Sequence, residues 1–73
     1  MKNKKIVIGL ACQIVYEYPD WSDQHVSDML KTYSDNGEKL PCDYDTLIDM
    51  CYLADKIKKQ GKSYKQAVKL LEK

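Results

Sequence analysis

Apolar residues recur at helical spacing along most of the chain and predict four helices separated by short polar breaks. In residues 4–18 the apolar side chains recur every four positions, at Ile6, Leu10, Ile14 and Tyr18, with Val7, Ala11 and Val15 beside them. The segment is rich in β-branched residues, but it is longer than a typical strand, so a helix fits better. Pro19 follows directly and ends this first helix, because a proline disfavours helical backbone in the residue before it.

The second predicted helix has a recognisable start. Ser22 is suited to capping it, and Trp21 and Val26 occupy the two positions of a hydrophobic staple. One apolar stripe then follows at helical spacing, formed by Val26, Met29, Leu30 and Tyr33. The pattern stops at residues 34–37, where Asn36 and Gly37 indicate a loop rather than a hairpin, since their flanks are polar.

The third helix has the most regular pattern in the chain. It begins at Asp43 or Asp45 and ends before Gly61, which suits a left-handed cap. Lysines near its end complement the negative pole of the helix dipole. Its expected inward stripe is Tyr44, Leu47, Ile48, Cys51, either Leu53 or Ala54, and Ile57.

Ser63 opens a fourth helix of about ten residues, and Gln66 completes a capping box with it. A helix this short does not persist alone in water, so it must dock on the others. Its expected inward residues are Tyr64, Ala67, Val68 and Leu71. The sequence therefore predicts an all-α fold, a compact bundle of about four short helices, as a single domain over residues 1–73.

The amino-acid composition limits the kinds of binding that this chain is expected to perform. The 73 residues include six tyrosines, one tryptophan and no phenylalanine, so tyrosine must either help to fill the core or serve as a binding anchor. The chain has no arginine, and lysine lacks the planar fork that makes bidentate contacts to guanine. Aligning Gly61 with the turn of a helix-turn-helix places Lys56 and Gln60 at positions that should be buried. Sequence-specific reading of DNA is therefore not expected.

Charge is segregated along the chain although the net charge is only +1. Residues 1–15 carry three lysines and no acid, residues 16–50 carry nine acids and two lysines, and residues 51–73 carry seven lysines and two acids. The middle of the sequence is thus net −7 and its end is net +5. Such segregation serves docking to a partner unless the fold itself neutralises it.

Three cysteines, Cys12, Cys42 and Cys51, form no paired spacing and indicate free thiols in a reducing, cytoplasmic setting. The lysine-rich start is followed by an apolar run, as in a secretory signal. The run stops at Gln13, however, and no small-residue cleavage site follows, so export is not expected. No apolar stretch approaches the roughly 20 residues of a membrane span, and no membrane association is expected.

We expect no enzyme, no metal and no cofactor. The chain has one histidine, His25, and no close pair of cysteines or histidines of the kind that holds zinc. The segment from Asp43 lacks the glycine and the glutamate of a calcium loop. A nucleophile formed by Cys12 and His25 is a minor hypothesis, and it requires a thiol with a lowered pKa.

The leading hypothesis is a small regulator or inhibitor that binds another protein through its acidic stretch. Carboxylates interspersed with aromatic side chains suit a basic surface on the partner. The candidate protein-binding residues are Tyr16, Tyr18, Asp23, Asp28 and Tyr33.

The alternative hypothesis is a nucleic-acid-binding regulator that uses a C-terminal lysine ridge. The ridge consists of Lys58, Lys59, Lys62, Lys65 and Lys69. Five neutralised phosphates would make log affinity fall with log salt at a slope of about −4 to −5. The sequence leaves homodimer formation open, because a core this small is often extended by an interface between copies.

Overall fold

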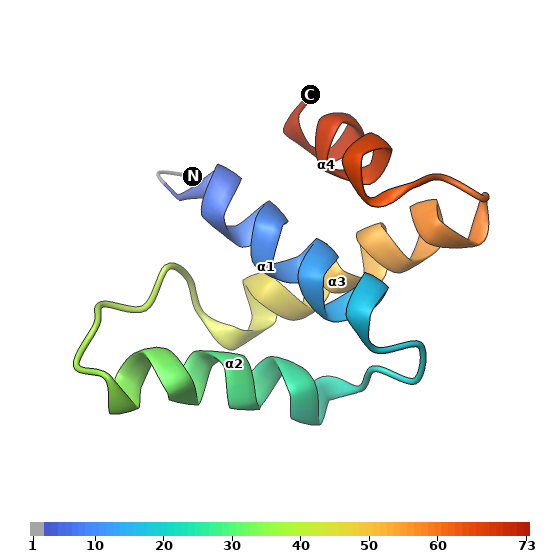
Figure 1. Cartoon of the computed structure of the whole chain (residues 1–73). Helices are drawn as coiled ribbons and strands as arrows, with labels where there is room; N and C mark the ends of the chain where they lie inside the picture. The colour runs from blue at the N-terminus through green and yellow to red at the C-terminus, as the bar shows by residue number, and fades with distance from the viewer. Residues whose placement is uncertain (1–2) are drawn as a thin grey trace.

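The computed structural model describes residues 3–73, which fold into four α-helices and contain no β-strand (Figure 1). The prediction of a small all-α bundle is confirmed. Met1 and Lys2, part of the lysine-rich start, lie outside the described residues. The helices are α1 (Lys4–Glu17), α2 (Asp23–Asp35), α3 (Tyr44–Lys59) and α4 (Tyr64–Glu72).

Helix α1 is the central element, since it packs against both α3 and α4. The predicted stripe was only partly right: Ile6 is 49% exposed and Tyr18 is 41% exposed. Helices on two sides of α1 bury a wider face, formed by Val7, Ile8, Ala11, Cys12, Ile14 and Val15. The helix also ends one residue earlier than predicted, because Tyr18 adopts extended backbone directly before Pro19.

Helix α2 begins where the sequence predicts, with Ser22 in extended backbone as its N-cap. Of the predicted staple, Val26 is fully buried and Trp21 is half-buried. The helix ends at Asp35, and the chain turns at Gly37 with φ +72°, a conformation that favours glycine. The predicted stripe faces inward as a set, with Leu30 buried and Met29 and Tyr33 half-buried.

Helix α3 starts after Asp43 rather than Asp45. The Asp43 side chain accepts a hydrogen bond from the backbone N–H of Thr46 at 3.2 Å, and this bond lowers the pKa of the carboxyl group. Of the two alternatives for the inward position, Ala54 is fully buried and Leu53 is 50% exposed. The remaining fully buried residues of α3 are Leu47 and Cys51.

The turn into α4 follows the sequence signals. Gly61 has φ +85°, and the Ser63 N–H donates to Gln66 Oε1 at 2.9 Å while the Gln66 N–H donates to Ser63 Oγ at 3.3 Å. Ala67 is fully buried, as predicted. Tyr64 was expected to face inward but is 43% exposed, because its ring packs edge-on against Tyr16 at the rim of the bundle.

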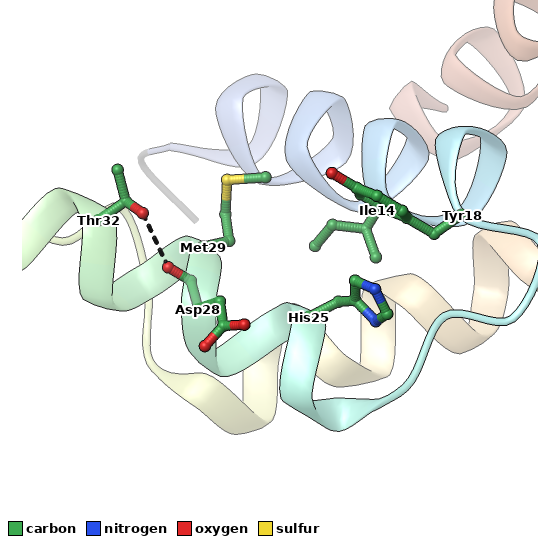
Figure 2. Close-up of a pocket in the computed structure, with 6 residues that line it drawn as sticks. All are labelled: Ile14, Tyr18, His25, Asp28, Met29 and Thr32. Atoms are coloured by element: carbon green, nitrogen blue, oxygen red, sulfur yellow. Dashed lines mark hydrogen bonds between the residues drawn. The ribbon is translucent and has the colours of Figure 1, made fainter.

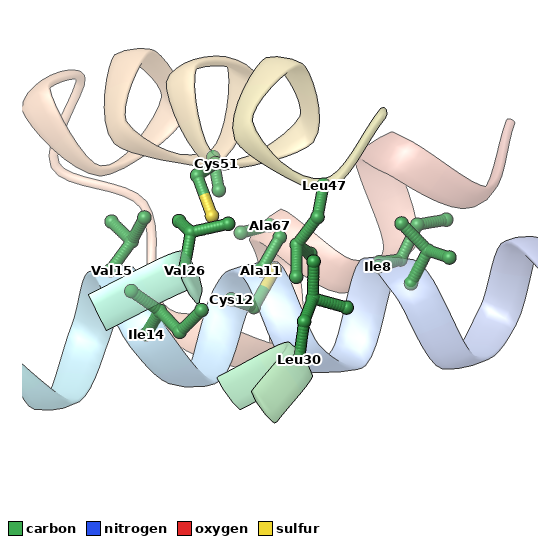
Figure 3. Close-up of a cluster of buried hydrophobic side chains, with 12 residues drawn as sticks. Ile8, Ala11, Cys12, Ile14, Val15, Val26, Leu30, Leu47, Cys51 and Ala67 are labelled. Carbon is green, nitrogen blue, oxygen red and sulfur yellow. The ribbon is translucent and has the colours of Figure 1, made fainter. Parts of the chain in front are cut away.

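Buried side chains from all four helices meet in one core (Figure 3). The Cα atoms span 36 × 27 × 17 Å. Most side chains outside the core are partly or fully exposed. The largest fully buried ones are Ile8, Ile14, Leu47, Val7, Val15, Val26, Cys12 and Cys51.

The packing separates the acid-rich helix α2 from the lysine-rich helix α4. Helix α2 packs on α3, and α4 packs on α1 and α3, so α2 and α4 lie on opposite sides of α1 (Figure 1). Within residues 3–73 there is one salt bridge, between Lys59 and Asp55. None of the described helices combines the length and the apolar character that a membrane span requires.

Candidate protein-interaction site

An open groove of about 200 Å³ lies between the end of α1 and one face of α2 (Figure 2). Helix α1 and the residue that follows it supply one wall, and α2 supplies the other. Side chains at helical spacing on α2 line the groove, because positions three and four apart share a helix face. The lining residues are Ile14, Tyr18, His25, Asp28, Met29 and Thr32.

At one end of the groove the rings of Tyr18 and His25 are stacked. Their centroids are 4.5 Å apart and the planes are tilted by 31°. The backbone N–H of Ser22 donates to Nδ1 of His25 at 3.1 Å, so this nitrogen is the acceptor and the neutral ring carries its proton on Nε2. His25 is thus fixed by the start of α2 and in turn positions the exposed Tyr18 ring.

Asp28 supplies the charge on the rim of the groove. Gln24 Nε2 donates to Asp28 Oδ1 at 3.0 Å, and among the described residues no cation pairs with this carboxylate. The Thr32 hydroxyl donates to the backbone carbonyl oxygen of Asp28 at 2.9 Å. Met29 is half-buried and offers an adaptable apolar surface beside the carboxylate. The groove therefore combines an apolar floor with one negative group at its edge.

The five predicted protein-binding residues do not form one surface. Tyr18 and Asp28 line the groove together. Asp23 is exposed in the first turn of α2 and, after burial, contributes to the raised pKa of Tyr44 on α3. Tyr33 is half-buried near the other end of α2.

Tyr16 does not line the groove and instead connects two parts of the fold. Its hydroxyl donates to the backbone carbonyl oxygen of Lys62 at 2.8 Å, and its ring lies edge-on to Tyr64 with centroids 5.9 Å apart. The Lys58 ammonium lies 5.6 Å from the ring centroid. Burial, and secondarily Cys12, raises the pKa of the Tyr16 phenol. Tyr16 therefore joins α1 to the turn between α3 and α4.

An aromatic pair that is not among the predicted binding residues joins the start of α2 to α3. Trp21 Nε1 donates to Asp55 Oδ1 at 3.3 Å, and the Trp21 ring is 5.3 Å from that of Tyr52. Tyr52 is 61% exposed. Its position off the apolar stripe of α3 is the sequence signal that could have identified it. Hydrogen bonds from Lys59, and to a lesser extent Trp21, outweigh burial and lower the pKa of Asp55.

The predicted lysine ridge is smaller than expected. Lys58 was expected to point away from the core, but it is half-buried and donates to the backbone carbonyl oxygen of Val15 at 3.1 Å. Lys59 pairs with Asp55 at 3.0 Å. Lys59 is itself exposed, and the exposed lysines of the ridge that form no salt bridge among the described residues are Lys62, Lys65 and Lys69.

A second open groove of about 200 Å³ lies along the outer side of α4. It is lined by Lys62, Gln66, Lys69 and Leu70, and Leu70 is 42% exposed. The groove thus has an apolar contact flanked by two lysines. Helix α4, which supplies most of this lining, lies on the opposite side of α1 from α2 (Figure 1).

The arrangement of the cysteines does not support the minor hypothesis of a Cys12–His25 nucleophile. Cys12 is fully buried in the core, and burial raises its pKa to about 11. His25 lies in the surface groove instead (Figure 2). Burial, with smaller contributions from Cys12 and Cys42, raises the pKa of Cys51 to about 12. Buried thiols with raised pKa values are poor nucleophiles.

Within residues 3–73 no group of three histidine, cysteine or acidic side chains is placed to hold a metal ion. Comparison of the chain with protein-family models, curated proteins and solved structures finds no match, so the site itself is the basis for a functional proposal.

Proposed function

We propose that this chain is a small non-enzymatic module that binds a basic segment of another protein in the groove between α1 and α2. The supporting observation is the placement of the stacked Tyr18 and His25 rings beside the carboxylate of Asp28, which forms no salt bridge within residues 3–73. A lysine or arginine side chain has an apolar stem and a charged head, which match the apolar floor and the acidic rim. Binding such a segment would make the protein a regulator or inhibitor of its partner.

The surroundings of the groove favour a cationic ligand. Exposed acidic residues lie at the end of α1, on the link between the helices and at both ends of α2: Glu17, Asp20, Asp23 and Asp35. Separated acidic and basic surfaces raise association rates and suppress binding of partners with the wrong charge. The exposed Tyr18 ring offers a contact to the aliphatic stem or a cation–π contact to the charged head.

A peptide titration followed by NMR tests this function. The probe is a helical peptide with lysines on one face and leucines on the other, and its control is the same peptide with glutamate in place of lysine. We expect the basic peptide to shift the amide signals of the groove residues on α1 and α2, with weaker binding at high salt. Shifts confined to α4, or equal binding of the acidic peptide, would contradict the proposal.

Two variants that each neutralise one carboxylate distinguish binding at the groove from a general effect of negative charge. D28N removes the charge on the rim of the groove, whereas D49N removes an exposed charge from α3. We expect D28N to weaken peptide binding by about five- to tenfold, as for a contact of about 1–1.4 kcal/mol, and D49N by less than about twofold. Equal losses in the two variants would mean that the peptide senses net charge and not the groove.

Nucleic-acid binding is the second candidate function, and the exposure of Lys62, Lys65 and Lys69 supports it. With Lys58 donating to the Val15 carbonyl and Lys59 paired with Asp55 at the surface, we expect a salt slope of about −3 instead of −4 to −5. Duplex DNA titrated at several salt concentrations measures this slope. An affinity that does not change with salt, or a slope that is the same in K62Q/K69Q, would rule out nucleic-acid binding through these lysines.

A further inference from the structure

Two grooves of similar size and opposite charge lie on opposite sides of the bundle. The groove on α2 is edged by Asp28, and the groove on α4 is edged by Lys62 and Lys69. Each also offers an apolar contact, Met29 on one side and Leu70 on the other. A polar rim around an apolar contact is the usual arrangement of a protein interface. The two surfaces therefore complement each other, although the fold keeps them apart.

Among the residues that the structure describes, no salt bridge compensates the charges at the end of α2 and at the start of α4. Helix α2 ends in Asp35 and has no basic residue in its last turn, so a carboxylate adds to the negative pole of the helix dipole. Helix α4 has no acid in its first turn, where Lys65 and the preceding Lys62 add to the positive pole. Both arrangements are unfavourable in an isolated chain. Contact between an α2 end and an α4 end would relieve both.

One molecule cannot make this contact with itself, because α2 and α4 lie on opposite sides of α1 (Figure 1). We infer that the α4 groove of one copy, with Lys62, Lys69 and Leu70, docks on the α2 face of a second copy, at Asp28, Asp35 and Met29. The inference uses the α1–α2 groove of the proposed function and names a second copy of this chain as one ligand of it. The net charge of +1 leaves little long-range repulsion between copies.

The contact is heterologous, because a different surface of each copy takes part. Each dimer then presents one unused acidic face and one unused lysine face. Heterologous contacts that do not close into a ring extend into open assemblies. The expected behaviour is therefore concentration-dependent growth that high salt reverses, rather than a dimer of fixed size.

Sedimentation velocity on the full chain tests the inference. We expect the average mass to rise with protein concentration at low salt and to return to the monomer at high salt. D28N/D35N and K62Q/K69Q should each remain monomeric, since each lacks one of the two surfaces. A matched control, D45N/D49N, removes two exposed charges from α3 and should associate like the unaltered chain. Circular dichroism checks that every variant retains its helices.

Mixing the two monomeric variants gives the decisive result. D28N/D35N keeps the lysine face and K62Q/K69Q keeps the acidic face, so an equal mixture should form a dimer that grows no further. A mixture that stays monomeric, or an unaltered chain that is monomeric at all concentrations, would overturn the inference. If the basic peptide still binds the groove in that case, the proposed function stands and only self-association fails. If neither self-association nor binding of the basic peptide is observed, the groove is not a binding site.

Discussion

The ammonium of Lys58 lies 3.1 Å from the backbone carbonyl oxygen of Val15, two residues before the last residue of α1. The last carbonyls of a helix lack partners within it, and they form the negative pole of its dipole. Helix α1 has no basic residue in its own last turn. A lysine from α3 therefore supplies the positive charge that α1 lacks, and it is withdrawn from the exposed lysine surface.

Replacing this lysine should destabilise the fold more than replacing its neighbour. We expect K58M to lower the free energy of unfolding by about 1 kcal/mol, because methionine keeps an apolar stem but cannot donate to the Val15 carbonyl. K59M should cost less than about 0.5 kcal/mol, since the Lys59 side chain is 77% exposed and its pair with Asp55 is screened by water. Urea denaturation measures both values. Equal losses would mean that the Lys58 contact adds nothing to stability.

Removing the hydroxyl of Tyr16 should loosen α4. Y16F retains the ring beneath Lys58 but removes the hydrogen bond to the Lys62 carbonyl, at a cost of about 0.5–1 kcal/mol. The effect should be local, because this bond connects α1 to the turn that precedes α4. Amide hydrogen exchange should therefore accelerate in α4 more than in α2.

The control for this variant is Y33F, since Tyr33 is half-buried on α2 and does not belong to the turn that precedes α4. Y33F should leave exchange in α4 unchanged. Uniform acceleration over all four helices in Y16F would show a global loss of stability and not a local link.

His25 should stabilise the start of α2 through Nδ1. H25A removes both the acceptor for the Ser22 N–H and the stack on Tyr18, and we expect it to cost about 0.5–1 kcal/mol. H25Q also loses the stack but restores an acceptor, because glutamine at this position completes a capping box. Thermal and urea unfolding should therefore rank H25Q between H25A and the unaltered chain. Identical stabilities for the two variants would leave the hydrogen bond without a measurable role.

The buried thiols should resist alkylation at neutral pH. Cys12 and Cys51 are fully buried, with pKa values raised by burial to about 11 and about 12, so both are protonated and shielded. Cys42 is half-buried, and its pKa is also raised, first by burial and then by Asp43. Mass spectrometry after a timed iodoacetamide pulse should find Cys42 modified first, and all three modified in urea. Rapid modification of Cys12 in the folded chain would contradict this order.

The same thiols should make the fold less stable at alkaline pH. Above the ordinary thiol pKa of 9.0 the unfolded chain loses these protons, while folded Cys12 and Cys51 keep theirs until about 11 and about 12. The folded state then binds more protons, so the free energy of unfolding falls as pH rises through this window. Urea denaturation at several pH values measures the fall. C51A should show a shallower decline than the unaltered chain, and parallel curves would exclude a contribution from Cys51.

The sequence by itself determined the helices and most of their ends. Ser63 with Gln66, and Gly61, act on backbone groups within a few positions of themselves, so their local signals are sufficient. The start of α3 was narrowed to Asp43 or Asp45, and the structure selects Asp43. It also located Tyr18 and Asp28 as candidate binding residues, both of which line the groove. The pairing of Tyr18 with His25 depends on how the chain bends between α1 and α2, and helical periodicity carries no information about that bend.

The tertiary structure decided which charges and aromatic rings remain available to a partner. Lys58 lies 43 positions from Val15, and Tyr16 lies 46 positions from Lys62, so no local pattern foretells either contact. The wider buried face of α1 likewise follows from packing against two helices at once. Helix formation depends on neighbours one turn away, whereas the exposure of a side chain depends on which distant helix covers it.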